Sequence, residues 1–269
     1  MDAVSPVPFD PPAPRPRRPW HTRPGVLSLA AIGTLLLAWQ LVSSAGWVPA
    51  LFLPPPSAVL AKLVSVSGEG FMDATLWQHT AASLQRVGLA LLLAVATAVP
   101  LGAWMGLSSR ARAVFDPLIE FYRPVPPLAY LPLIVIWFGI GELSKVLLIA
   151  LAIFAPLVIA TATGVANTPE ARVRVARSFG ATRAQVLRHI VLPNALPDLM
   201  TGLRVGLGVG WSTLVAATRG LGFLVQSAAQ FLSTDIVVLG ILVIAIVAFG
   251  LELALRALQR RWVPWVGKS

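Results

Sequence analysis

The sequence contains no cysteine and few charged residues. Without cysteine, the chain has no disulfide bonds, thiolate metal ligands or cysteine nucleophiles. Charged residues make up 12% of its 269 residues, which is about half of the usual share in soluble domains. Hydrophobic residues make up 57%, and the charges are clustered between long apolar stretches. This pattern predicts a multi-pass membrane protein.

The chain also lacks the residue groups that enzymes need. It has no G-x-x-x-x-G-K-[ST] phosphate-binding loop, because none of its three lysines follows glycine at that spacing. The histidines, His21, His79 and His189, lie far apart without ligand spacing, and no nucleophile-base pair is visible. We therefore predict no catalytic residue, no metal site and no cofactor bound by this chain, which argues against an intramembrane enzyme.

Six apolar stretches approach the length of about 20 residues that spans a bilayer core. Four are nearly free of charge, whereas the third and fifth carry charged residues. The predicted spans cover residues 26–48, 87–109, 117–141, 146–167, 197–218 and 236–255. In the third, the Pro124–Pro127 segment must interrupt the helix, because proline lacks a backbone N–H. The sequence thus predicts an all-α membrane protein with six transmembrane helices.

The positive charges predict the orientation. Most of the 21 Lys and Arg residues lie near the two termini, in the 110–116 turn and in the loop 168–195. If the N-terminus is cytoplasmic, all these segments lie on the cytoplasmic side of the membrane. This placement agrees with the excess of Lys and Arg that cytoplasmic loops carry. We therefore predict an N-in, C-in topology. The cations left outside are Lys62, Arg86, Lys145 and Arg219.

The first 23 residues are rich in proline and arginine. They lack apolar periodicity, so we predict a disordered cytoplasmic tail over residues 1–23 and a transmembrane domain over residues 24–269. A cleaved signal peptide is the alternative, but the apolar stretch after the tail exceeds the usual 7–15 residues of such peptides.

The cytoplasmic loop 168–195 predicts two short helices. Thr168-Pro169-Glu170 is typical of a helix start, with an N-cap hydroxyl followed by proline. Gly180 is suited to the helix end, and Thr182 with Gln185 forms a capping box for the second helix. Pro193 is expected to limit that helix.

Apolar side chains within this loop are expected to contact each other, and five arginines cover the rest. The apolar ones are Val175, Phe179, Val186, Leu187 and Ile190. A basic helix-turn-helix can read DNA, but this loop is tethered to membrane spans at both ends and leaves no room for a supporting core. An amphipathic loop lying on anionic headgroups remains an alternative.

The loop also carries a motif. Gly180, nine further residues, then Ile190-Val191-Leu192-Pro193 resembles the G-x9-I-x-L-P core of the cytoplasmic "EAA" loop of ATP-binding-cassette importer permeases. Where many members have Glu-Ala-Ala, this chain has Arg174-Val175-Ala176. Other segments resemble the taurine, sulfonate and nitrate branch of that family, so that the likeness covers nearly the whole chain. They are residues 51–59, 70–79, 121–145 and 202–217.

The resemblance implies a type I importer permease in the bacterial inner membrane. It implies a homodimer, two cytoplasmic ATPase subunits that bind ATP and Mg, and a periplasmic binding protein that delivers substrate; no nucleic acid is implied. The residues that match the ATPase-docking loop are Arg174, Ala176, Gly180, Ile190, Leu192 and Pro193. The implied substrate is taurine or a related alkanesulfonate. Nitrate or an aromatic sulfonate is the alternative, as is a secondary transporter, which would need repeated halves and buried carboxylates.

Five residues are candidates for the translocation path. Ionisable groups within spans default to functional or interior-facing positions, and broken helices often lie at transport sites. The candidates are Arg123, Tyr130, Trp137, Trp211 and Thr213. For Arg123, the alternatives are a juxtamembrane ion-pair cluster with Asp116 and Glu120 that anchors the span, and a place at the dimer interface. Membrane-interface anchoring is the alternative for Tyr130 and Trp137, and ordinary helix packing is the alternative for Trp211 and Thr213.

One segment departs from the family pattern. Members of this branch carry about five more residues, including a glutamate, where residues 215–220 are continuous here. At 100° and 1.5 Å per helical residue, losing five residues rotates the rest of the helix by roughly 140° and shortens the span by about 7.5 Å. This departure puts the external gate in question.

Overall fold

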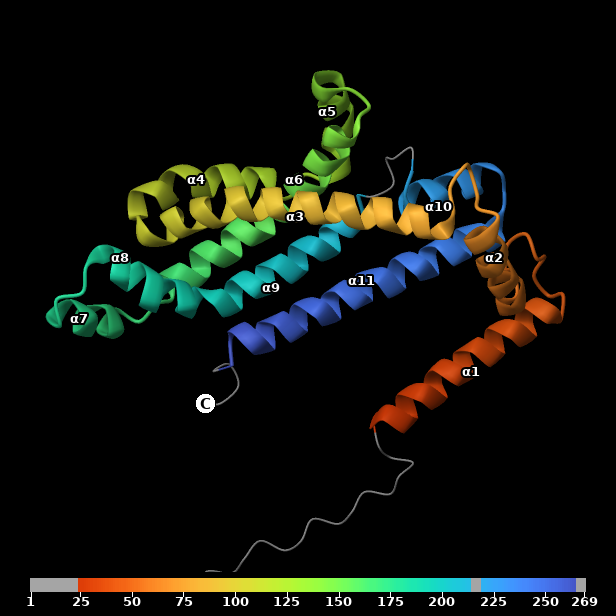
Figure 1. Ribbon diagram of the computed structural model, residues 1–269, viewed down its shortest axis with the longest axis horizontal. Helices are drawn as coiled ribbons and strands as arrows, with labels where there is room; N and C mark the ends of the chain where they lie inside the picture. The colour runs from red at the N-terminus through yellow and green to blue at the C-terminus, as the bar shows by residue number, and fades with distance from the viewer. Residues whose placement is uncertain (1–23, 214–218, 265–269) are drawn as a thin grey trace, which may run out of the picture. The chain divides into compact units, whose positions relative to one another are not determined.

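The computed structural model describes residues 24–213 and 219–264, which are mostly helical (Figure 1). The predicted tail and most of the shortened segment at 215–220 lie outside the described residues. The described helices are α1 (Pro24–Ser44), α2 (Pro56–Gly68), α3 (Leu76–Leu107), α4 (Ser109–Tyr122), α5 (Leu131–Phe138), α6 (Glu142–Ala166), α7 (Glu170–Ser178), α8 (Arg183–Val186), α9 (Leu192–Trp211), α10 (Leu221–Gln230) and α11 (Thr234–Trp262). A 3-10 turn at Pro127–Tyr130 precedes α5, and a π turn at Leu187–Val191 joins α8 to α9.

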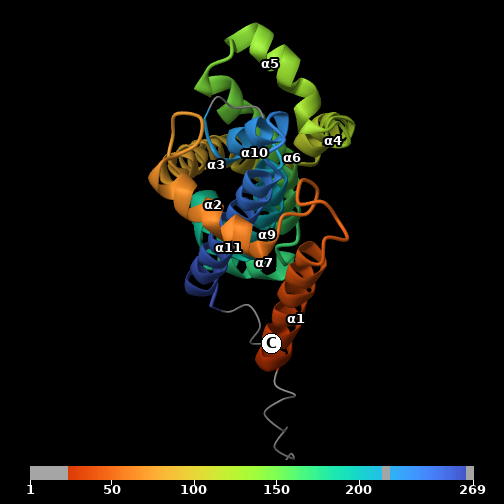
Figure 2. The same ribbon diagram turned by 90° about the vertical axis from the view of Figure 1, so that its right-hand side faces the viewer.

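Four of these helices, α1, α3, α6 and α11, are long and apolar enough to cross a membrane. A fifth span would combine α4 with the segment Pro127–Phe138, but the two are bent by 90°. Figures 1 and 2 both show α5 turned away from the axis of α4. The described residues therefore supply four or five candidate spans rather than six. The missing one is α9, which is long enough but not apolar enough, because it carries Asp198 and Arg204.

The second predicted span begins much earlier in the structure than residue 87. Its helix, α3, starts at Leu76 because Thr75 and Gln78 form a capping box. The Gln78 N–H donates to Thr75 Oγ1 at 3.3 Å, and the Thr75 N–H donates to Gln78 Oε1 at 2.9 Å. Such a box satisfies two backbone donors that a helix start leaves unpaired. The hydropathy pattern marked only the apolar part of this longer helix.

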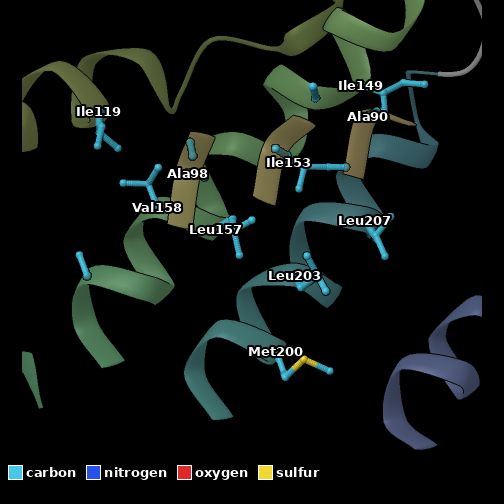
Figure 3. Close-up of a cluster of buried hydrophobic side chains, with 14 of the residues drawn as sticks. Ala90, Ala98, Ile119, Ile149, Ile153, Leu157, Val158, Met200, Leu203 and Leu207 are labelled. Carbon is cyan, nitrogen blue, oxygen red and sulfur yellow. The ribbon is translucent and has the colours of Figure 1, made fainter. Parts of the chain in front are cut away.

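The centre of the transmembrane unit is built on α6, which packs against α3 on one side and α9 on another (Figure 1). Figure 3 shows Ile153 and Leu157 of α6 beside Ala90 and Ala98 of α3 and Leu203 of α9. The side chains of Ile153 and Leu157 are fully buried. This three-helix arrangement fixes the positions of the candidate sites.

Small residues line the face of α3 and the face of α9 that contact α6. On α3 and α9 they recur at every fourth position, as Ala90, Ala94, Ala98, Gly102 and Gly106, and as Gly202, Gly206 and Gly210. A spacing of four places them on one face of a helix. Within lipid the hydrophobic effect does not drive helices together, so close backbone approach at small residues contributes van der Waals packing. These stripes explain why three helices with few polar contacts pack tightly.

Replacing Gly102 with alanine is expected to destabilise the protein by about 1–3 kcal/mol, as overpacking of a well-packed core does. A Cβ atom at Gly102 would lie 2.6 Å from the Val158 carbonyl oxygen and 2.7 Å from Thr161 Cβ. Gly88, on the same helix, is the matched control because nothing lies within 4 Å of its added Cβ. Thermal unfolding in detergent measures both variants. Equal melting temperatures would contradict this close packing of α3 on α6.

Candidate functional site

The two-helix segment α7–α8 turns at Gly180, whose φ is +81°. The Gly180 N–H donates to the Arg177 carbonyl at 2.9 Å, and the Ala181 N–H donates to the Ala176 carbonyl at 3.1 Å. These two bonds form a Schellman motif, which requires a left-handed residue and favours glycine. The predicted helix end at Gly180 is confirmed.

The two predicted helix starts have different outcomes. The capping box before α8 is confirmed, because the Gln185 N–H donates to Thr182 Oγ1 at 3.3 Å and the Thr182 N–H donates to Gln185 Oε1 at 2.8 Å. The predicted cap at Thr168 is wrong. The N-cap of α7 is Pro169, without a side-chain hydrogen bond, and the Thr168 hydroxyl instead accepts from Asn194 Nδ2 of α9 at 3.4 Å.

Pro193 does not end the second helix, which is a further correction. The chain passes from α8 through the π turn directly into α9, and Pro193 is the second residue of α9. The Leu192 N–H donates to the Leu187 carbonyl, five residues back. Because hydrogen bonds shift by one residue in a π turn, the chain passes a proline that would break a regular helix. The end of the loop and the helix of the fifth predicted span are therefore continuous.

The loop packs on α6 and α9 through a small apolar cluster. Its buried members are Val165, Val186, Val191 and Ala195, and its partly buried members include Val173, Ala176, Leu187 and Ile190. The predicted contacts of Val186, Leu187 and Ile190 are confirmed.

Two predicted apolar contacts of the loop are wrong. Val175 is 56% exposed and Phe179 is 87% exposed. The helix α7 and the residue that follows it thus present two large apolar side chains to their surroundings. Beside them lies Arg174, whose exposed side chain is 3.6 Å from Glu170. An exposed apolar patch rimmed by charge is typical of a protein–protein contact.

A second candidate feature is a cavity of about 440 Å³ between the end of α4 and the helices α6 and α9. Its walls are mostly apolar, and Arg123 supplies a cation. The Tyr122 hydroxyl, also at the cavity, donates to the Leu151 carbonyl at 2.6 Å. The Tyr122 ring stacks on Tyr130 with centroids 5.5 Å apart. Of the five path candidates, Arg123 lines this cavity, whereas Tyr130 does not line it and is linked to it only through its ring stack on Tyr122.

The other three path candidates lie elsewhere. Trp137 is 66% exposed on α5. Trp211 lines a separate opening of about 300 Å³ with Arg204 and Glu252. Thr213 is buried, and its hydroxyl donates to the Gly210 carbonyl at 2.8 Å, which is ordinary helix packing for a threonine.

Sequence reasoning missed a charged cluster around Glu142, the first residue of α6. The Arg86 guanidinium, from α3, donates to both Glu142 carboxylate oxygens and to the Arg219 carbonyl. Lys145 Nζ lies 2.9 Å from Glu142 Oε1. Only 5% of the Arg86 side chain is exposed. One signal in the sequence could have pointed to this region. Arg86, Lys145 and Arg219 are three of the four cations that the predicted topology leaves on the outer side of the membrane.

His79 and Ser83 extend this contact along α3. The Gly220 N–H donates to His79 Nδ1 at 3.1 Å, and the Leu221 N–H donates to Ser83 Oγ at 2.9 Å. Gly220 has φ +119°, and an added Cβ would lie 2.6 Å from Arg86 Nη1, so glycine is required there. His79 therefore fixes the start of α10. In the described part of the chain, no three His, Asp or Glu side chains gather in a way that could hold a metal ion.

Together, the apolar helices, the basic two-helix loop and the cavity beside a broken helix define the membrane-embedded part of a transporter. The model of one family, "Binding-protein-dependent transport system inner membrane component", matches residues 98–264. The chain belongs to this family. It is a transport subunit and a multi-pass protein of the inner membrane.

Two kinds of transport permease are similar to this chain over nearly its whole length. The chain is 59% identical over 253 residues to "Taurine transport system permease protein TauC" of Escherichia coli strain K12, with 92% of each chain covered. It is 34% identical over 252 residues to "Putative aliphatic sulfonates transport permease protein SsuC" of the same organism, covering 92% of this chain and 91% of the relative. The SsuC protein of Bacillus subtilis strain 168 is 33% identical over 257 residues, covering 93% and 91%.

Proposed function

We propose that this chain forms the translocation path of an ATP-driven importer for taurine or related alkanesulfonates. The observation that carries the proposal is the 59% identity, over nearly the whole chain, to a taurine permease. The more distant sulfonate permeases support the broader substrate class. Nitrate or aromatic sulfonates remain the second candidates.

The proposal includes a homodimer, two cytoplasmic ATPase subunits that bind ATP and Mg, and a periplasmic binding protein. The ATPase would dock on the loop that contains Arg174, Ala176, Gly180, Ile190, Leu192 and Pro193. The exposed Phe179 and Val175 support this role, because a partner surface would remove both from water. The continuity of the loop with α9 also supports this role. An ATPase subunit bound to the loop would be connected to α9 without an intervening flexible segment.

Within the membrane, we propose that the cavity lined by Tyr122 and Arg123 is part of the path. A sulfonate is an anion with oxygens in a geometry that a guanidinium fork can bind. The cavity supplies that cation in mostly apolar walls, as small-molecule sites do. Trp137, Trp211 and Thr213 stay predictions without support from this cavity.

Uptake by the purified complex tests the function. The permease, its ATPase and its binding protein would be reconstituted in liposomes and supplied with labelled taurine, nitrate or an aromatic sulfonate. We expect taurine uptake that requires both ATP and the binding protein. Uptake driven only by an ion gradient would instead identify a secondary transporter, and uptake of nitrate alone would overturn the sulfonate assignment.

The six-span, N-in and C-in topology is also part of the proposal, with α9 as a span. Because the chain has no cysteine, single cysteines can report sidedness. Ser67 and Ser178 are both exposed and closely match cysteine in size. An impermeant thiol reagent applied to intact cells with a permeable outer membrane should label Ser67→Cys, and should label Ser178→Cys only after the inner membrane is opened. The reverse result would contradict the topology.

A further inference from the structure

The charged cluster around Glu142 is unusual for its predicted location. In the proposed topology Lys62, Arg86, Lys145 and Arg219 are the cations outside the membrane, where Lys and Arg are normally depleted. Lys62 pairs with Asp235 at 3.7 Å. Arg86 and Lys145 both pair with the single carboxylate of Glu142, and Arg219, whose backbone carbonyl accepts from Arg86, lines the same opening as Arg86 and Glu142. The cluster therefore has more positive than negative charge.

This excess charge faces an opening of about 250 Å³ at the outer end of α3 and α6. Ala82, Gln85, Arg86, Glu142 and Arg219 are among the residues that line it. Arg86 is held in place by Glu142 and the Arg219 carbonyl, so its charge is largely offset. The Arg219 side chain is exposed, and no ion pair of its guanidinium occurs among residues 24–213 and 219–264.

The opening is suited to a small polar ligand. Its volume is smaller than the cavities of about 300–1,000 Å³ that bind drug-sized ligands. It is nevertheless large enough for several water molecules, each of which occupies about 30 Å³ in the liquid. Arg219 offers a planar fork of donors that matches an oxyanion, and Gln85 adds an amide donor. The Glu142 carboxylate lines the same opening, but its two oxygens already accept from Arg86 and Lys145, so the opening favours the anionic end of a ligand.

We propose that this opening binds the sulfonate group of the substrate at the outer end of the path, with Arg219 as the direct contact. The sulfonate identity and the outward position rest on the proposed function, whereas the preference for an anion rests on the charges alone. The site lies apart from the cavity at Arg123, whose walls are formed by other residues.

Because the native chain has no cysteine, a single introduced cysteine can report the local charge through its reaction rates with charged reagents. An Ala82→Cys variant places one thiol in the opening, and Ala81→Cys places one on the exposed side of the same turn. Both are assembled with the ATPase subunits and reacted with an anionic and a cationic methanethiosulfonate reagent. We expect the ratio of anionic to cationic rates to be higher at position 82 than at position 81.

Adding Arg219→Gln should lower that ratio about sevenfold at position 82. At about 7 Å across water, one unit charge changes the local concentration of a singly charged reagent about threefold, in opposite directions for the two reagents. Arg219→Lys should restore the ratio, and Lys62→Gln should leave it unchanged. An unchanged ratio in the Arg219→Gln protein overturns the proposal.

Occupancy is tested with a neutral maleimide. Millimolar taurine or ethanesulfonate should slow labelling of Ala82→Cys, and sodium chloride of equal ionic strength should not. The protection should be lost with Arg219→Gln. A complex that imports taurine but shows no such protection overturns this site and leaves the proposed function standing. Protection by sulfonates in a complex that imports none supports the site and overturns the function.

Discussion

Replacing Gly180 with valine is expected to lower the affinity of the ATPase subunit for the permease by roughly tenfold or more, with about fivefold as the smallest effect. The φ of +81° at this position is strained for a β-branched residue by about 1–3 kcal/mol, and 1.4 kcal/mol corresponds to a tenfold change in affinity. Relief of that strain would break the Schellman bonds from Gly180 and Ala181 and reorient α7 against α8. Co-purification of the ATPase at graded concentrations, followed by measurement of its affinity, tests this expectation.

The matched control is Gly180→Asn. Asparagine tolerates the left-handed conformation, and nothing lies within 4 Å of a Cβ added at Gly180, so its side chain has room. This variant should bind the ATPase almost as well as the native chain. Both variants should insert in the membrane normally, because the turn lies outside the transmembrane core. Native-like binding by the valine variant would refute a docking role that depends on this turn.

Replacing Arg86 with leucine is expected to destabilise the folded protein by about 2–4 kcal/mol. Removing one partner of a buried ion pair costs about 3–5 kcal/mol, but Glu142 is 60% exposed and can regain water, which reduces the cost. The change also removes the donor to the Arg219 carbonyl, so the start of α10 loses one of its ties to α3. Taurine uptake should fall with the loss of stability.

A surface ion pair supplies the control for Arg86. Lys62 lies 3.7 Å from Asp235, and 44% of its side chain is exposed, so Lys62→Leu should cost less than about 1 kcal/mol. Thermal unfolding of both variants in the same detergent measures the difference. Similar melting temperatures for the two would mean that the Arg86 cluster contributes no more than an exposed pair.

Local sequence rules predicted the local structure well. The helix end at Gly180 and the capping box at Thr182 depend only on residues within a few positions of each other, so their side chains suffice to predict them. The interruption at Pro124–Pro127 was predicted for the same reason. The 90° bend between α4 and the next segment was not, because proline determines that a helix breaks but not the direction in which the chain continues.

Features that depend on distant residues could not be read from the sequence. Arg86 and Glu142 lie 56 positions apart, and no spacing rule links residues so far apart in the chain. Phe179 was expected to contact the other apolar side chains of the loop, but its exposure depends on which face of the loop meets α6 and α9. Pro193 was misjudged because the rule for proline assumes a regular helix, and the π turn before it relaxes that rule.

The stripes of alanine and glycine on α3 and α9 have an entropic consequence. Burying a Leu or Met side chain costs up to about 1–2 kcal/mol in lost rotamers, whereas alanine and glycine have no rotamers to lose. The contacts that α6 makes with its two neighbours therefore form with little ordering of the stripe residues. A slide by one residue would bring larger side chains against the α6 backbone. Any movement of these three helices should thus displace them together as one rigid body, while changes of shape are confined to the joints at their ends.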